Sequence, residues 1–468
     1  MSTFSGLNTA YTALTAARRG LDVIGQNVAN ANTPGYTRQR LETSATAPLS
    51  STGFSTGPRV GQGVTVDGIA RLGSLQLDAR VRATTAVSGF SAVRANALSA
   101  LEVSLNEPGD NGISASLDNF WAAWQGVSNK PGDPATAEVL LNEAATVASR
   151  ISSGYLSVAN QFKDVRSDLA AMADELNTAG AQLAGLNGAV RSALSNGGSV
   201  SELLDQRNAL ASTVAALAGG TVRESADGMA DILVGGNAFV TGEVFRPVEV
   251  VGGSALGSED PVRLVWSHRS GDSVALTGGE MAGALSLLAP GADLAKAAAS
   301  YNSLAEKLAS TVNAVHRTGT APGDGTAGST AGLDFFSFDA GQPALNLHII
   351  PTSAAGIAAG NGTGGFDGSI ADKISQLGTS PNSPDKLWSA FVAGTGAAAR
   401  SEMQQAKLAG VAASSAVGLQ LANSSVDLDE ENMNLLAYQH AYQGASRVMS
   451  AIDEMLDTLI NRTGIVGR

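Results

Sequence analysis

The chain has no cysteine, which excludes disulfide bonds and cysteine-ligated metal sites. It also has no run of about 18 apolar residues, so we expect no membrane insertion. Its 29 Lys and Arg are outnumbered by 42 Asp and Glu, and the formal net charge is −13. Because nucleic-acid binding depends on cationic contacts to phosphates, this balance argues against a nucleic-acid partner.

Catalytic chemistry is equally scarce. The four histidines are scattered and form no pair with the spacing of metal ligands. The string Gly323–Gly328 fits G-x-G-x-x-G, but it follows a predicted helix instead of a strand, so it lacks the geometry that cradles phosphates. No serine nucleophile with a histidine and an acid can be proposed. We therefore predict a non-enzyme with no cofactor and no metal.

The chain is rich in small and apolar residues. Of its 468 residues, 44% are hydrophobic and only 5% aromatic, while glycine numbers 55. A chain of this length can bury several cores, so two or three domains are expected. The abundance of small residues favours closely packed helices over a bulky aromatic core.

Both ends carry apolar residues that step by three and four. Such a stripe lies on one face of a helix and forms the seam of a coiled coil. The ends also differ in charge: residues 1–60 hold five Arg against two acids, and residues 401–468 hold eight acids against four bases. We predict that the two ends pair and form an assembly interface, whose seam is Leu7, Ala10, Leu14, Ala17, Leu21, Ile24 and Val28 with Leu435, Tyr438, Tyr442, Ala445, Met449, Ile452, Leu456 and Leu459.

The first helix is predicted to stop in a loop rich in asparagine. Asn and Gly accept left-handed backbone angles, and a proline forces the residue before it out of the helical region. An extended polar run over residues 37–40 follows. We include the loop in the predicted assembly interface through Asn27, Asn30, Pro34, Gly35 and Tyr36.

The last helix has a clear start. Asp427 is predicted to cap it, and Glu430, three residues on, to reach back as the acid of a capping box. Further acids at positions 429 and 431 suit the positive end of the helix dipole.

The predicted fold is mainly α with a small β insert. Long terminal helices pair as a coiled coil in a domain of residues 1–60 plus 405–468. Residues 64–219 plus 279–404 form an antiparallel helical bundle that includes an irregular segment over 319–383. Short β-rich runs between Gly and Asp turns indicate an inserted domain at 220–278.

Several strings resemble a known family. Ser5-Gly6-Leu7 with Asn30-Ala-Asn-Thr-Pro-Gly-Tyr36 is similar to the N-terminal signature of bacterial flagellar axial proteins. Residues 429–435, 438–443 and 453–461 are similar to the matching C-terminal signature. Between them, Leu117, Phe120, Trp121 and Trp124 recur at helical spacing before an Asn-Lys-Pro turn, as in the flagellar hook-associated protein 1 family. The same four residues are expected to be helix core.

The resemblance implies a structural subunit at the hook–filament junction, needed for filament assembly. Its implied partners are copies of itself in a helical ring, the hook protein, the second hook-associated junction protein, an export chaperone and the type III export apparatus. It also implies an extracellular location in the flagellum, reached without a cleaved signal peptide; the N-terminus has no basic region of the kind that begins such a peptide.

Two alternatives stay open: a secreted coiled-coil adhesin or hydrolase carrier whose β insert binds a ligand, or another axial subunit of rod, hook or filament. Whichever holds, each terminal helix keeps an apolar flank that its partner cannot cover, on the last helix Ala441, Val448 and Met455. We therefore predict that the termini are largely disordered in the isolated monomer and become ordered on assembly.

Overall fold

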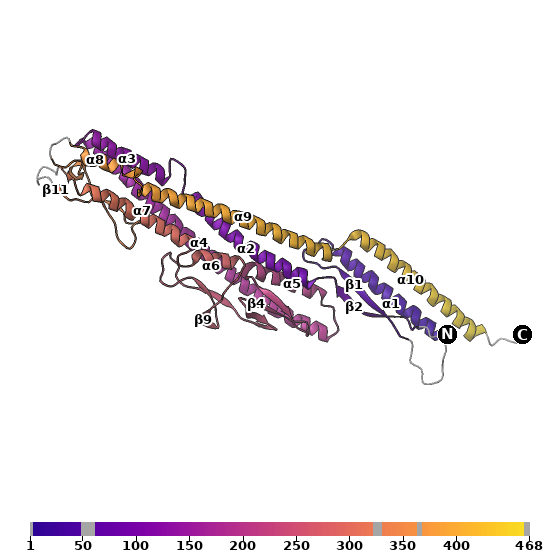
Figure 1. Cartoon of the computed structure of the whole chain (residues 1–468). Coiled ribbons are helices and arrows are strands. Elements are labelled where there is room, and N and C mark those ends of the chain that lie inside the picture. The colour runs from indigo at the N-terminus through magenta and orange to yellow at the C-terminus, as the bar shows by residue number, and fades with distance from the viewer. Residues whose placement is uncertain (1–2, 48–60, 322–329, 363–366, 463–468) are drawn as a thin grey trace.

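The computed structural model describes residues 3–47, 61–321, 330–362 and 367–462. The molecule is elongated, and its long helices run close to the long axis (Figure 1). Both termini lie at one end, where α1 and α10 lie side by side, and the opposite end holds α3 and α8. The Gly323–Gly328 string lies outside the described residues, as do other parts of the predicted irregular segment and of the predicted terminal domain.

Helices dominate the chain, and α4 alone spans 62 residues, or about 93 Å at 1.5 Å per residue. The α-helices are α1 (Thr3–Ala29), α2 (Leu75–Ser104), α3 (Ile113–Asn129), α4 (Pro134–Ser195), α5 (Ser201–Ala218), α6 (Glu280–Leu288), α7 (Asp293–His316), α8 (Ser369–Ser375), α9 (Pro384–Ser424) and α10 (Leu428–Asp457). Two 3-10 turns, η1 (Ala354–Gly356) and η2 (Leu377–Thr379), and a π-helical turn, η3 (Thr458–Arg462), complete them.

Local sequence explains where the long helices begin. The carboxylate of Asp133 accepts from the backbone N–H of Ala135 at the start of α4, and the Ser383 hydroxyl accepts from that of Lys386 at the start of α9. Each is followed by a proline, whose fixed φ suits the first helical position. The helix α5 ends at Gly219, which adopts φ +69° where a side chain would be strained.

The strands are short and antiparallel. They are β1 (Gln39–Ala45), β2 (Val64–Arg71), β3 (Thr221–Glu224), β4 (Ala230–Val234), β5 (Asn237–Thr241), β6 (Val244–Phe245), β7 (Val248–Val251), β8 (Arg263–Trp266), β9 (Arg269–Ser273), β10 (Thr320–Ala321), β11 (Thr330–Ala331), β12 (Phe336–Ser337) and β13 (His348–Ile349). One sheet has the order β3-β4-β5-β6 and another β7-β8-β9; β1-β2, β10-β11 and β12-β13 are two-stranded.

The two larger sheets are packed on one face of α4. Asn187 of α4, 1% exposed, donates to the carbonyls of Ala230 and Gly242 and accepts from the N–H of Ala230. Gly180 lies seven residues before Asn187 on the same face of α4. The ring of Phe239 occupies the space that a side chain at Gly180 would fill. The insert therefore shares one continuous hydrophobic core with the helices.

The far end of the molecule is closed by aromatic side chains. Phe120 and Trp124 are fully buried and meet Phe335 and Phe336, with ring centroids 5.0 to 6.2 Å apart for the closest pairs. His316 lies beside Trp124, 0% exposed, accepts from the N–H of Ala358 at 2.9 Å, and bonds the Leu333 carbonyl at 2.8 Å. The prediction of a helix core for the residues of α3 is confirmed.

Several local predictions need correction. The antiparallel pair β1-β2 was not foreseen, although Val64-Thr-Val-Asp alternates as a strand does. Within the segment predicted to be irregular over 319–383, residues 342–346 form turns and the short strand β13 follows them. The predicted domain boundary between residues 404 and 405 falls inside α9, which runs without a break to Ser424. The cap at Asp427 is confirmed, but the capping-box role of Glu430 is wrong, because its carboxylate accepts from Arg38 instead.

Candidate assembly interface

The helices α1 and α10 form an antiparallel pair with a constant register. Gly6 faces Ile452, Gly20 faces Tyr438, and Asn27 bonds Glu431. Successive contacts are 14 and then 7 residues apart along α1, and they are equally far apart in the opposite direction along α10. The register is therefore heptad-based over the whole contact. At Gly20 a Cβ atom would overlap the Tyr438 ring, so glycine is what allows this close approach.

The predicted seam residues differ in how fully this pairing covers them. Five are buried: Ala10, Ala17, Ile24, Ala445 and Ile452. Seven are partly covered: Leu7, Leu14, Leu21, Leu435, Tyr438, Met449 and Leu456. Three are exposed in the single chain: Val28, Tyr442 and Leu459.

The asparagine-rich loop turns the chain back onto α1. The Asn27 side chain is 1% exposed; its oxygen accepts from the N–H of Gln39 and the hydroxyl of Tyr36, both at 2.9 Å, and its amide donates to the Gln39 carbonyl. Asn30 donates to the Gln26 carbonyl at 3.0 Å and accepts from Thr33. The two-way bond of Asn27 imitates a strand partner for Gln39 and so fixes the start of β1.

Pro34 and Gly35 are exposed at the tip of this loop, and Gly35 adopts φ +79°, a conformation that favours glycine. Tyr36 is partly buried beside acidic residues. Burial and the nearby negative charge of Asp205 raise the pKa of its phenol to about 12, so the hydroxyl stays a donor to Asn27 at physiological pH.

An ion-pair cluster that the sequence did not reveal joins the loop to α10. Arg38 donates through Nε to Glu431 at 2.7 Å and through Nη1 to Glu430 at 2.8 Å. Glu431 is almost fully buried and also accepts from the Asn27 amide at 3.2 Å. The hydrogen bond from Arg38 lowers the pKa of the Glu430 carboxyl below its ordinary value. The acids predicted to serve the helix dipole thus also hold the two ends together.

The terminal pair is attached to the helical body beside this cluster. Asp205 of α5 accepts from the N–H of Thr37 at 3.0 Å and from Nε of Arg71 at 2.5 Å. Arg38 N–H donates to the carbonyl of Ser424 at the end of α9, and the Arg38 carbonyl accepts from the N–H of Leu72, both at 2.9 Å. These bonds connect segments from four distant parts of the chain.

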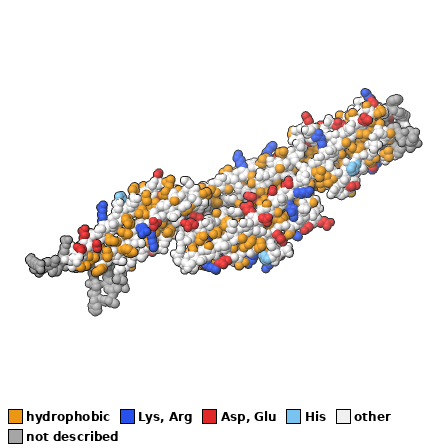
Figure 2. Space-filling view, turned by 180° about the vertical axis from the view of Figure 1, so that it is seen from behind, with side chains coloured by type: hydrophobic (Ala, Val, Ile, Leu, Met, Phe, Trp, Pro, Cys, Tyr) orange, Lys and Arg blue, Asp and Glu red, His pale blue; other side chains and the backbone are white. Residues whose placement is uncertain are grey.

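Beyond the paired seam, apolar side chains remain uncovered along the outer flank of the terminal helices. Val448 and Met455 are 51% and 53% exposed, and Ala441 is exposed too, as the sequence predicts. Apolar side chains are spread along the length of the molecule in Figure 2. The large exposed ones on α1, α9 and α10 are Phe4, Tyr11, Val28, Leu387, Met403, Leu408, Val411, Val417, Leu419, Leu421, Leu428, Met433, Leu436, Tyr442, Val448 and Met455.

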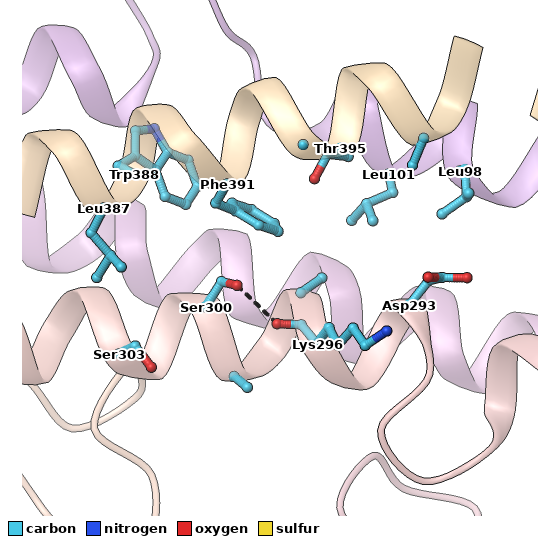
Figure 3. Close-up of a pocket in the computed structure, with 14 residues that line it drawn as sticks. Leu98, Leu101, Asp293, Lys296, Ser300, Ser303, Leu387, Trp388, Phe391 and Thr395 are labelled. Carbon is cyan, nitrogen blue, oxygen red and sulfur yellow. Dashed lines mark hydrogen bonds between the residues drawn. The ribbon is translucent and has the colours of Figure 1, made fainter. Parts of the chain in front are cut away.

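A second surface feature is an apolar groove of about 490 Å³ between α2, α7 and α9. Figure 3 shows Trp388 and Phe391 of α9 and Leu98 and Leu101 of α2 on one side. Asp293, Lys296, Ser300 and Ser303 of α7 lie opposite, where the Ser300 hydroxyl is bonded to the Lys296 carbonyl at 2.9 Å. Apart from Thr395 of α9, the polar groups belong to α7, and they do not converge on a common point.

Within the ranges that the structure describes, no group of His, Asp and Glu side chains is placed to hold a metal ion. The helices of the described residues include none with the length and hydropathy needed to cross a membrane.

Comparison with known proteins identifies the family in which such a pair of terminal helices occurs. The model of the flagellar hook-associated protein FlgK helical domain matches residues 98–336, just over half of the chain. The chain belongs to the flagellar hook-associated protein family. It is a structural protein of the bacterial flagellum.

The ends match separate models. The flagella basal body rod protein model covers residues 7–37, which contain most of α1 and the asparagine-rich loop. The C-terminal model of the flagellar basal body rod FlgEFG proteins covers 420–462, which contains α10. The resemblance of the two ends to axial proteins is confirmed.

Two relatives illustrate the extent of the similarity. Flagellar hook-associated protein 1 of Bacillus subtilis is 28% identical over the full length of both chains. The protein of the same name from Escherichia coli is 27% identical over 72% of this chain and 60% of its own length. Among solved structures, the flagellar hook junction protein FlgK from Burkholderia pseudomallei has the same fold, with a TM-score of 0.61 over 74% of this chain and 99% of that one at 16% identity.

Proposed function

We propose that the chain forms the junction between hook and filament and is needed for filament assembly. The observation that carries this proposal is the α1–α10 pair, whose seam is only partly closed and whose outer flank is apolar and exposed. Apolar flanks of this kind are covered when subunits associate. The family membership supplies the flagellar setting.

In the proposed ring, the terminal helices line the inner tube, and each flank packs against the terminal pair of the next copy. The helical body and the β insert then lie outward. The faces at the two ends of the ring would contact the hook protein and the second hook-associated junction protein. The predicted interface residues, from Leu7 to Tyr36 and from Leu435 to Leu459, all belong to the inner layer.

Deleting the gene tests this role. We expect cells with intact hooks, no filaments and no motility, and complementation by the full chain should restore both filaments and motility. A matched complementation with Val448→Asp and Met455→Asp should leave hooks without filaments, because the charges prevent burial of the flank. Normal motility after deletion would contradict the proposal and favour an adhesin.

We also propose that the chain leaves the cell through the flagellar type III export apparatus without a cleaved signal peptide, and that a chaperone covers the exposed flank before assembly. In a strain that makes no filaments, the full-length chain should accumulate in the medium with its own N-terminal residues. Recovery of a chain shortened at the N-terminus would contradict the first part. An equally soluble full chain with and without its export chaperone would contradict the second.

The β insert is proposed to lie on the outer surface and to be dispensable for incorporation. Replacing Thr221–Ala275 by a short Gly/Ser linker should lower the melting temperature, because Phe239 no longer covers α4 at Gly180. The variant should still enter the junction. A milder version places an epitope at Gly271, which is exposed and has free space around it. If either variant folds but does not assemble, the outward placement is wrong.

A further inference from the structure

A cavity of about 320 Å³ lies between α2, α5 and the strands β3 and β4. Three arginines line it, Arg71, Arg82 and Arg207, together with the acids Asp78 and Glu224. Among its lining residues, Leu75 is 60% exposed and Glu224 is also exposed. The cavity borders the joint at Asp205 through Arg71, but it shares no lining residue with the seam of α1 and α10 or with the groove of Figure 3.

Two of the arginines already have partners. Arg71 donates to Asp205 at 2.5 Å, and Arg207 donates to Glu224 at 3.0 Å and to the Gly228 carbonyl at 2.6 Å. Asp78 accepts from the Gln420 amide at 2.5 Å and lies 4.0 Å from Arg71. The nearby carboxylates are therefore all used by other groups.

Arg82 is different. Its residue is 7% exposed, and its guanidinium makes a single hydrogen bond, from Nη1 to the Asn208 side-chain oxygen at 2.8 Å. No acid in the described part of the chain comes close enough to form an ion pair with it. Burial lowers the pKa of this guanidinium, and the charges of Asp78 and Glu224 nearby offset this only in part. A guanidinium carries five N–H donors, so four of these have no protein acceptor.

Those unused donors reach open space. Among the residues described, the buried side-chain nitrogens without a hydrogen-bond partner are Trp124 Nε1 and Arg166 Nε. No nitrogen of Arg82 is among them, so its unused donors are not enclosed by protein atoms. Arg82 lines the cavity, so an anion bound there would lie within reach of these donors. Asn208 lines the same cavity and places its amide beside them.

We propose that this cavity is a binding site for a free tetrahedral oxyanion, phosphate or sulfate, with Arg82 as its principal ligand. The planar guanidinium fork matches the oxygens of such an anion, and charge-assisted bonds in a partly dry cavity are the strong ones. The bound anion would lie against α2, α5 and the first strands of the insert. It would therefore hold the insert to the helical body, independently of any role at the hook.

The first test is thermal unfolding of the full chain in sodium phosphate against sodium chloride at matched ionic strength, with sodium sulfate as a third arm. We expect a melting temperature that rises saturably with phosphate or sulfate and not with chloride, and heat of binding in isothermal titration at one site. Equal curves in all three salts would overturn the proposal.

Variants then locate the site. Asn208→Asp puts a carboxylate 2.8 Å from Nη1 of Arg82, so it adds a hydrogen-bonded counter-charge from within the protein. It should raise the melting temperature without phosphate and weaken phosphate binding about tenfold or more, and Arg82→Gln should abolish binding. Arg80→Gln, at an exposed position of the same helix, is the control and should keep the full response.

A wild-type phosphate response in Asn208→Asp, or its loss in Arg80→Gln, would overturn the assignment. If Arg82→Gln does not fold, the Asn208→Asp result decides, because that substitution keeps size and shape.

Discussion

The terminal pair and the helical body are built from equally regular helices but are buried very differently. Of the 17 residues in α3, eight are buried, including Phe120 and Trp124 at 0% exposed. Of the 30 residues in α10, the buried ones are Glu431, Ala445 and Ile452. The continuous hydrophobic core runs from Ala97 to Ala399 and includes no described residue of α1 or α10.

The contrast shows that helical sequence does not measure how much stability a helix contributes. Helices in proteins owe most of their stability to packing of an apolar face. The body packs its faces within one chain, so we expect it to fold alone. The two terminal helices leave apolar surface uncovered, so we expect the terminal pair to depend on neighbouring copies. The predictions below separate these two regions.

The largest effect is expected in the body. Phe120→Ala removes a fully buried ring that meets Trp121, Trp124, Phe335 and Phe336, and we expect a loss of about 3–5 kcal/mol in the free energy of unfolding. Chemical denaturation of the purified chain measures it. A loss below about 1 kcal/mol would show that the aromatic cluster at the far end of the molecule is not a packed core.

The next effect concerns the ion-pair cluster. Glu431→Gln turns an amide donor toward Arg38 or Asn27 and should cost the terminal pair about 1–3 kcal/mol, because the site is buried. Its matched control is Glu430→Gln, where the side chain is 51% exposed and the change should be much smaller, because solvent screens an exposed ion pair. Protease cleavage within residues 3–47 of the assembled junction reports the difference. Equal cleavage of both variants would contradict the central role of Glu431.

Glycines in α1 offer a smaller and sharper comparison. Gly20→Ala places a Cβ against the Tyr438 ring, whereas Gly25→Ala meets nothing within 4 Å. Both gain the same helix propensity, so their difference isolates the contact and should be about 1 kcal/mol against Gly20→Ala. Filament assembly should fail in Gly20→Ala and persist in Gly25→Ala, while the body melts normally in both. Failure of Gly25→Ala would mean that the outer face of α1 is the critical surface.

The smallest effect is a pH dependence of the body. Burial lowers the pKa of His316 below its ordinary value, so its contribution to stability is complete above about pH 6.5 and is lost as pH falls below that value. One such group changes the free energy of unfolding by at most about 1.4 kcal/mol per pH unit.

Denaturation of wild type and His316→Gln between pH 7.5 and 5 should give a shallower slope for the variant. His440→Gln, at an exposed position of α10, should keep the wild-type slope. Equal slopes in all three would show that His316 does not titrate differently in the folded state.

The sequence predicted what periodicity and short strings can carry. Apolar steps of three and four located α1 and α10, and Asp427 marked the start of the last helix correctly. Arg38 was not found because its partners Glu430 and Glu431 are almost 400 residues away, and acids at a helix start have a sufficient local explanation in the dipole. The contact through Asp205 was not predicted for the same reason, because a polar contact between distant segments produces no periodic pattern in the sequence.

Amide hydrogen exchange along the full chain tests the central claim most directly, because it reports both regions in one sample. In the purified monomer at low concentration, we predict slow exchange across α4 and α7 and fast exchange across Leu435–Leu459. In the assembled junction both regions should exchange slowly. Slow exchange across Leu435–Leu459 in the monomer would contradict the account, because it would show that the terminal pair is stable without neighbouring copies.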